Sequence, residues 1–308
     1  MRVAQAPLPG PRARKSMMPR MGRRLLALAW LAFGLAAVDP LPLLAQSQPP
    51  DPRTAMPERP TVATHAHTIT AGYVEIETGI QRLHPQAGET EYDSPSLVKV
   101  GLASRLQFDM YEGISAALRQ TGQNAFGIGD VSVGLKWRAI DGAPLLGDFA
   151  VQSTVKFPTG SVSKGTGTGT TDLTVILISS SRLGPALLDV NVGFTARSGD
   201  GSVVPTRATL WTMSWGLPVR GRVGWVAEIF GFPGTRGPSG ERPVVGLLTG
   251  PTCVIRRHLV IDGGFIVRLA GPQANTAYAG LTWNIGRLWR SRPPTGSAAQ
   301  RLEMRTKG

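Results

Sequence analysis

From about Phe149 to Ile285 the sequence alternates apolar and polar residues one by one, and this alternation constrains the fold more than any other feature. From Leu188 to Ala196, for example, apolar side chains at every second position are interleaved with polar ones such as Asp189 and Asn191. Successive side chains of a β-strand point to opposite faces. The polar face includes charges, which a two-layer soluble core would not accommodate. The pattern is typical of a wall with hydrocarbon on one side and water on the other.

The same alternation appears in residues 131–138 and again in 278–285. After the N-terminal region, no stretch has the long apolar run that a transmembrane helix requires, and a chain that spans a membrane without helices forms a closed barrel. We therefore predict an all-β protein, a transmembrane antiparallel up-and-down β-barrel of about 12 strands. The predicted strands are 66–80, 96–106, 110–119, 129–140, 148–157, 172–182, 187–197, 207–217, 222–231, 243–256, 260–269 and 276–286. Gly250-Pro251 interrupts the tenth of these, so a bulge or an early end is expected there.

The connections between the predicted strands alternate long and short. The odd ones, such as 158–171, are long, and the even ones, such as 218–221, are tight. Bacterial outer-membrane barrels show this asymmetry, with short periplasmic turns, longer external loops and an even number of strands. Several tryptophans fall near predicted periplasmic strand ends, as expected for an aromatic girdle at the membrane interface: Trp137, Trp215, Trp225 and Trp283.

The chain divides into four predicted parts. Residues 1–45 form a secretory signal peptide, because a basic stretch precedes an apolar run and a small-residue site before Gln46. Residues 46–61 are rich in proline and are predicted to be an extended, poorly ordered linker. Residues 62–286 form the barrel, and residues 287–308 form a basic C-terminal tail.

The formal net charge of +13 would suggest nucleic-acid binding if it were spread over the folded region. Seven basic residues and no acid lie in residues 1–24, however, and six basic residues and one acid lie in the tail 287–308. The body of the chain is therefore close to neutral. A nucleic-acid partner is not expected.

Several short segments, in this order along the chain, resemble a known family. They are Gly127–Arg138, Val155–Gly160, Leu188–Phe194, Val226–Gly231 and Ile261–Gly264. Together they resemble the transporter-like outer-membrane family named for the MetA pathway of phenol degradation, over most of residues 66–286. The resemblance implies an outer-membrane barrel that passes small, often aromatic or hydrophobic compounds. The chain departs from a typical outer-membrane protein in continuing through a basic tail to Gly308 instead of ending on an aromatic residue.

Charged residues on the polar face of the strands are the candidate functional residues. A Lys or Arg on the lipid face near the midplane costs roughly 2–4 kcal/mol, so these charges should face the lumen. They would either pair with one another and stiffen a narrow lumen or tune what passes through it. A modest basic excess hints at tolerance of anions, which loops folded inward could reverse. The predicted lumen-facing charges are Glu75, Glu77, Lys99, Arg105, Lys136, Arg138, Lys156, Asp189, Arg197, Glu228, Asp262 and Arg268.

No catalytic residues or metal ligands are predicted. His65 and His67 share a strand face, but no carboxylate or thiol pattern completes a metal site, so a solvated pair at the rim is favoured. Ser239 lies in Gly237–Glu241, which departs from the nucleophile-elbow pattern at its last position and falls in a loop. It is interpreted as a turn residue.

The sequence thus predicts an outer-membrane channel of a Gram-negative bacterium that passes small molecules by passive diffusion, with neither enzymatic activity nor a cofactor. Its expected partners are a small-molecule substrate, outer-membrane lipid and the barrel assembly machinery. Two alternatives remain open from the sequence. One is an outer-membrane barrel that hydrolyses lipids, and the other is a secreted β-sandwich binding module.

Overall fold

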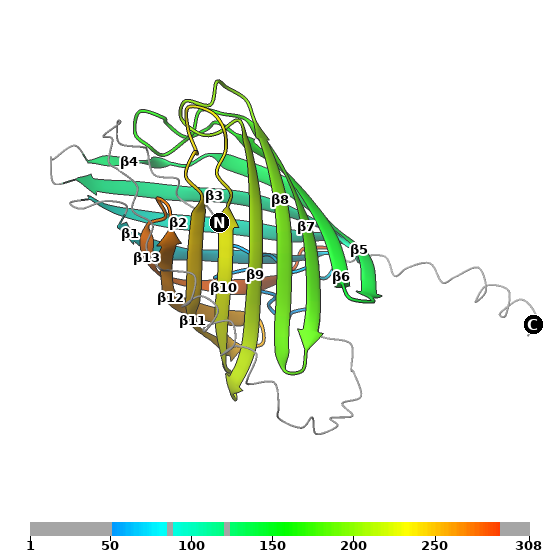
Figure 1. The fold of residues 1–308 in the computed structure, drawn as a ribbon. Helices are drawn as coiled ribbons and strands as arrows, with labels where there is room; N and C mark the ends of the chain where they lie inside the picture. The colour runs from blue at the N-terminus through cyan, green and yellow to red at the C-terminus, as the bar shows by residue number, and fades with distance from the viewer. Residues whose placement is uncertain (1–50, 85–88, 120–123, 290–308) are drawn as a thin grey trace, which may run out of the picture.

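A computed structural model describes residues 51–84, 89–119 and 124–289, and in it the chain forms one continuous antiparallel sheet (Figure 1). Within these residues, no helix is long and apolar enough to cross a membrane. The strands are β1 (Tyr73–His84), β2 (Glu89–Ala103), β3 (Leu106–Arg119), β4 (Ala125–Ile128), β5 (Val131–Ala143), β6 (Gly147–Phe157), β7 (Asp172–Leu183), β8 (Ala186–Arg197), β9 (Arg207–Arg220), β10 (Val223–Phe232), β11 (Val244–Arg256), β12 (Leu259–Ala270) and β13 (Asn275–Arg287).

The sheet closes on itself because β13 pairs with β1 and β1 with β2. Two strands, β4 and β5, share one position in the barrel. Both pair with β3, β4 through Ile114–Ala117 and β5 through Leu106–Tyr111. Gly129 and Asp130 separate them. The result is a closed barrel of 12 strand positions, which confirms the predicted fold class and rules out the β-sandwich alternative.

Long and short connections alternate around the barrel. The turns at 104–105, 184–185, 221–222 and 257–258 have two residues each, whereas the connections 158–171 and 233–243 are much longer. We call the two ends of the barrel the short-turn end and the long-loop end. Since closed barrels leave no strand edge unpaired, the whole backbone of the wall can be satisfied inside the membrane.

Apolar side chains point out of the barrel and polar ones point in. On β8, the Val192 side chain is 40% exposed and that of its neighbour Asn191 is 1% exposed. On β13, Trp283 is exposed while Thr282 and Asn284 are buried. This inverts the arrangement of a soluble protein, because the outer face meets hydrocarbon and the interior holds polar groups.

An apolar cluster is also present inside the barrel, on one side of the wall. Phe230, Leu248, Ile266 and Tyr278 come from β10 to β13 and pack together, each at most 5% exposed. Val62 packs against them from the N-terminal part of the chain. A second, smaller cluster joins Ala66 to Ala150 on β6 and Ile178 on β7. The interior is therefore mostly polar, with two apolar patches.

Some local expectations were wrong, among them the start of the first strand and the interruption at Gly250-Pro251. The strand predicted at 66–80 begins only at Tyr73 and continues to His84. At Gly250-Pro251, β11 neither ends nor bulges, although the ladder to β12 lacks pairs between Thr249 and Thr252. Glycine is required there, because a Cβ at Gly250 would lie 2.0 Å from the Gly263 carbonyl oxygen.

Candidate functional site in the barrel lumen

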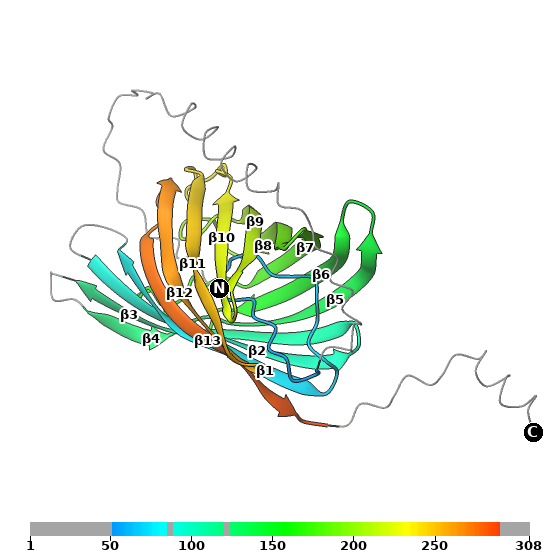
Figure 2. The ribbon, with the colours of Figure 1, turned by 90° about the horizontal axis from the view of Figure 1, so that it is seen from below.

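Residues Asp51–Gly72 run through the inside of the barrel, and we call them the lumen segment (Figure 2). Both ends of this segment lie at the short-turn end. Ala55 N donates to the Arg257 carbonyl at 2.9 Å, and Gly72 N donates to the Gly101 carbonyl at 2.7 Å. Between these points the segment arches across the lumen without forming a strand.

The lumen segment includes most of the predicted linker. The proline-rich composition of 46–61 suggested a poorly ordered tether, but residues 51–61 are held against the wall, and residues 46–50 lie outside the described residues. The predicted signal peptide also lies outside the described residues, as does the tail after residue 289. The strand predicted from residue 66 starts late because residues 66–72 still belong to the lumen segment.

Three glutamates of the wall accept hydrogen bonds from the backbone of the lumen segment. Glu75 accepts from Met56 N at 2.9 Å. Glu77 accepts from two consecutive N–H groups, those of residues 58 and 59, at 2.8 and 2.9 Å. Glu228, on the other side of the barrel, accepts from those of residues 62 and 63, both at 2.7 Å. Buried backbone donors need such partners, and the wall supplies them from side chains.

Neutral side chains hold the rest of the arch. Asn191 accepts from Thr64 N at 2.7 Å and donates to the carbonyl of the same residue at 3.0 Å. Ser180 accepts from Ala66 N at 2.8 Å. Gln107 accepts from Ile69 N at 2.9 Å. The lumen segment is thus anchored residue by residue to strands on nearly every side of the barrel.

Lys99 on β2 ties the start of the lumen segment, at Met56, to β1. Its Nζ atom lies 2.7 Å from Glu75 Oε1 and also pairs with Glu77. The same atom donates to the Met56 carbonyl at 2.6 Å. The Lys99 side chain has no exposed surface, so these bonds offset the cost of removing its charge from water.

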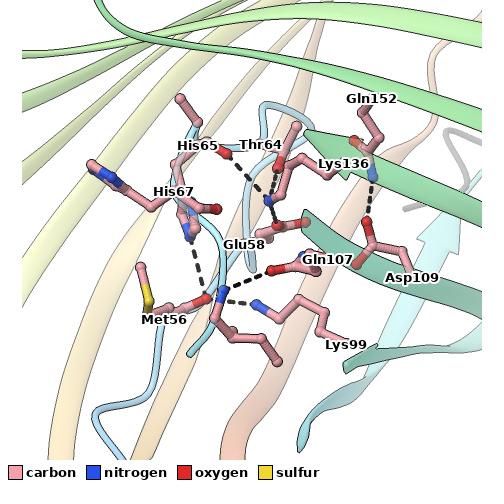
Figure 3. Close-up of polar contacts among 12 residues, drawn as sticks. Met56, Glu58, Thr64, His65, His67, Lys99, Gln107, Asp109, Lys136 and Gln152 are labelled. Atoms are coloured by element: carbon pink, nitrogen blue, oxygen red, sulfur yellow. Dashed lines mark hydrogen bonds and ion pairs between the residues drawn. The ribbon is translucent and has the colours of Figure 1, made fainter. Parts of the chain in front are cut away.

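Lys136 on β5 binds the middle of the lumen segment (Figure 3). It forms an ion pair with Glu58 of the lumen segment, and both side chains are buried. It also donates to the His65 carbonyl at 3.2 Å and the Thr64 hydroxyl at 3.4 Å. Two buried lysines therefore bind the lumen segment, and each has at least one carboxylate partner.

Sequence reasoning missed several polar residues of the lumen, including Asp109 and Gln152. Asp109 accepts from Gln107 Nε2 at 2.7 Å and from Gln152 Nε2 at 2.8 Å. The predicted turn between strands was placed at 107–109, whereas the turn is at 104–105. The alternation of Gln107, Phe108 and Asp109 in the sequence could have predicted that both polar residues face the lumen. In the structure both are buried, and Phe108 between them is not.

Other predicted charges pair near the ends of the barrel. Asp262 lies 3.4 Å from Arg59 of the lumen segment. At the long-loop end, Asp172 lies 3.3 Å from Lys156 and 3.1 Å from Arg197. Lys156 also lies 3.0 Å from Asp130, at the break between β4 and β5.

Arg105 and Arg138 both pair with Asp141 at the short-turn end. Arg105 lies in the turn after β2, not within a strand, and is about half exposed. Arg268 is exposed near the end of β12, and Asp189 on β8 accepts a hydrogen bond from Ser180. Only two of the seven predicted cations, Lys99 and Lys136, are thus fully buried in the lumen.

His65 and His67 lie inside the barrel with ring centroids 5.6 Å apart. His65 contacts the Met56 and His67 carbonyls through its ring nitrogens, and His67 lies 3.2 Å from Asp148. Burial, followed by the charge of Lys136, lowers the pKa of His65 to about 3, so the ring is neutral near pH 7. Across the described ranges, no three His, Cys, Asp or Glu side chains gather closely enough to hold a metal ion.

Ser239, which the sequence analysis weighed as a nucleophile, has a structural role. Ser239 is buried in the connection between β10 and β11, and its hydroxyl donates to the Gly201 carbonyl. This bond ties two long loops together at the long-loop end. The interpretation of Ser239 as a turn residue agrees with this contact.

Comparison with known proteins gives structural neighbours only. No family model and no curated protein sequence matches the chain. An outer membrane channel from Pseudomonas putida F1 is similar in structure, with a TM-score of 0.55 at 9% identity, covering 71% of this chain and 98% of that one. The NanC porin has a TM-score of 0.47 at 10% identity, covering 68% and 98%, respectively. The fold is that of an outer-membrane β-barrel.

Proposed function

We propose that this chain is an outer-membrane channel of a Gram-negative bacterium through which small molecules pass by diffusion, without a cofactor, energy coupling or enzymatic activity. The observation that carries the proposal is the combination of an apolar outer face with a polar, charged lumen in a closed barrel. Such an interior offers water and hydrogen-bonding groups to a permeant. The likeness in fold to an outer membrane channel supports the same interpretation.

The finer assignment is part of the proposal. The motifs that resemble the family named for the MetA pathway of phenol degradation favour small aromatic or hydrophobic permeants. The apolar cluster around Phe230 and Tyr278 would give such compounds a surface inside the lumen. The proposed partners are outer-membrane lipid around the barrel and the machinery that inserts barrels.

The lumen segment governs passage in this proposal. It crosses the lumen near the short-turn end and is held by bonds to β1, β3, β7, β8 and β10. A permeant must therefore pass beside the segment or displace it. The channel is narrow while the segment is seated and wider when it is displaced.

Planar-bilayer recording tests the proposal. We expect the full-length protein to conduct. A disulfide between Ala66→Cys and Ser180→Cys, in a Cys253→Ser background, should hold the lumen segment in place and lower the conductance. A chemical reductant that opens this disulfide should restore the conductance. The two positions are adjacent, since Ala66 N lies 2.8 Å from Ser180 Oγ. A silent bilayer combined with hydrolysis of outer-membrane lipids would contradict a channel and favour the lipid hydrolase.

A further inference from the structure

Two carboxylates of the lumen wall each bind a pair of neighbouring N–H groups. Glu77 accepts from Glu58 N and Arg59 N at 2.8 and 2.9 Å, one on each carboxylate oxygen. Glu228 accepts from Val62 N and Ala63 N at 2.7 Å, again one on each oxygen. Two parallel N–H donors facing the two oxygens of a carboxylate are the arrangement that a guanidinium group makes with a carboxylate.

Unpartnered polar atoms lie beside the Glu77 position. Thr282 is the cross-strand partner of Glu77, is fully buried, and has no hydrogen-bond partner for its hydroxyl among the described residues. Asn284 is the cross-strand partner of Glu75, is 1% exposed, and its Oδ1 atom also lacks a partner there. Both side chains share the inward face of β13, so they offer acceptors that the lumen segment does not use.

The charges at these positions favour a cation. In the part of the chain that the structure describes, Glu228 forms no ion pair with Lys or Arg, and its carboxylate is satisfied by uncharged backbone donors. Glu75 and Glu77 share the single cation Lys99. A hydrogen bond between two charged groups is roughly twice as strong as one with a neutral partner. A cation with paired N–H donors would therefore compete well with the backbone of the lumen segment.

We propose that Glu228 and Glu77 form a binding site for guanidinium-bearing small molecules, and that the lumen segment occupies this site as an internal stand-in until such a cation displaces it. The inference rests on the proposed channel function and extends it by naming a charged group, guanidinium, that a permeant would carry. The lumen segment occupies the site with backbone N–H groups, not with a guanidinium side chain. The site on Glu228 is the stronger of the two, because Lys99 does not compete for it.

The test measures access to the lumen segment in the full-length protein. A single cysteine is introduced by Ala63→Cys in a Cys253→Ser background, and its rate of reaction with a small thiol reagent is followed as butylguanidinium is added. We expect the rate to rise several-fold and to saturate. Butylurea, which has the same shape and the same paired donors without the charge, should leave the rate unchanged.

Two variants in that background test whether Glu228 forms the site. Glu228→Gln should label faster without any ligand and lose the response to butylguanidinium. Asp109→Asn is the matched control, because Asp109 is also a fully buried inward carboxylate but accepts from Gln107 and Gln152, not from the lumen segment. It should keep the full response. Equal acceleration by butylurea, or an unchanged response in Glu228→Gln, would overturn the proposal.

A second measurement covers the case in which Ala63→Cys does not fold. Amide hydrogen exchange at Val62 and Ala63 in the unaltered protein should accelerate with butylguanidinium and not with butylurea, and the absence of that difference would contradict the site. The results separate the two proposals. A response in a protein that never conducts would retain the site and reject the channel, whereas a conducting protein without a response would retain the channel and reject the site.

Discussion

The barrel wall and the lumen segment satisfy their backbone hydrogen bonds in different ways. The strands of the wall pair with the backbone of neighbouring strands, whereas Asp51–Gly72 forms no strand and donates mostly to side chains such as Glu77, Asn191 and Glu228. The wall therefore depends on a repeated pattern that many residues share. The lumen segment depends on a few particular side chains, each of which has its own role.

The largest effect should come from removing a lysine that the two regions share. Lys99→Met would leave Glu75 and Glu77 buried without a cation, and breaking a buried ion pair by removing one partner costs about 3–5 kcal/mol. Denaturant unfolding of the protein refolded in lipid, followed by tryptophan fluorescence, measures this loss. Lys164→Met, at an exposed loop lysine, should change the free energy of unfolding by less than about 0.5 kcal/mol. Equal stability of the two variants would show that the lumen contacts contribute little.

A charge on the outer face should destabilise the wall and leave the lumen segment seated. Val192 lies near the middle of β8 on the lipid side, so Val192→Arg should cost about 2–4 kcal/mol. Val162→Arg is the matched control, because Val162 is similarly exposed, at 47% against 40% for Val192, but lies in the connection 158–171. The same unfolding assay compares them. If both variants behave alike, the outer face of β8 does not meet hydrocarbon.

Loss of a neutral anchor should affect the lumen segment alone. Asn191→Leu removes both hydrogen bonds to Thr64 and leaves its backbone groups without partners, at a cost of about 1–3 kcal/mol. Amide hydrogen exchange at Thr64 and its neighbours should accelerate, while exchange in β8 and β9 stays slow. Acceleration throughout β8 and β9 would mean that the wall and the lumen segment unfold together, which would contradict the difference drawn between them.

The smallest predicted effect is a response to acid. Burial and the charge of Lys136 lower the pKa of His65 to about 3, whereas a released segment would have a histidine with the ordinary value of about 6.5. The released state therefore binds a proton more readily. Seating is fully favourable above about pH 6.5 and weakens as the pH falls toward 3.

Other charges facing His65 act in a lower pH range. Although burial raises the pKa of Glu58, the charges of Lys136 and Lys99 bring it below its ordinary value, so protonation of Glu58 weakens the seated state only below about pH 4.5. His67 is the remaining titratable neighbour of His65. A spin label at Thr61→Cys in a Cys253→Ser background should become more mobile as the pH falls. His65→Gln should reduce the change above about pH 4.5 without abolishing it, because burial also lowers the pKa of His67. A profile identical to that of the unsubstituted protein would contradict the role of His65.

The strands could be predicted from the sequence because their signal is local. Predicted 172–182 and 187–197 correspond to β7 at 172–183 and β8 at 186–197. Errors arose where the local pattern was ambiguous. The turn before β3 was placed three residues late, which hid Gln107 and Asp109. Residues 125–128, which form β4, were assigned to a connection, and the strand predicted at 129–140 began two residues before β5.

The candidate site was predicted only in part. Inward charges such as Glu77, Lys99 and Glu228 were identified from their alternation with apolar neighbours, but not their shared partner. That partner is the lumen segment, of which residues 51–61 belong to the proline-rich stretch predicted as a tether and residues 62–72 to the region predicted as barrel. Its hydrogen bonds join residues far apart in the chain, such as Val62 and Glu228, which are separated by 166 positions.

The sequence by itself determined that the chain forms a closed barrel with an apolar outer face and a polar lumen. Alternate residues of a strand point to opposite faces, and each residue type favours either hydrocarbon or water. Only the tertiary structure decided what occupies the interior. The lumen segment has no periodic pattern of its own, and its path exists only where the closed barrel brings carboxylates and amides from distant strands around it. Closure is a property of the whole sheet, so the position of the segment could not be read from any stretch of residues alone.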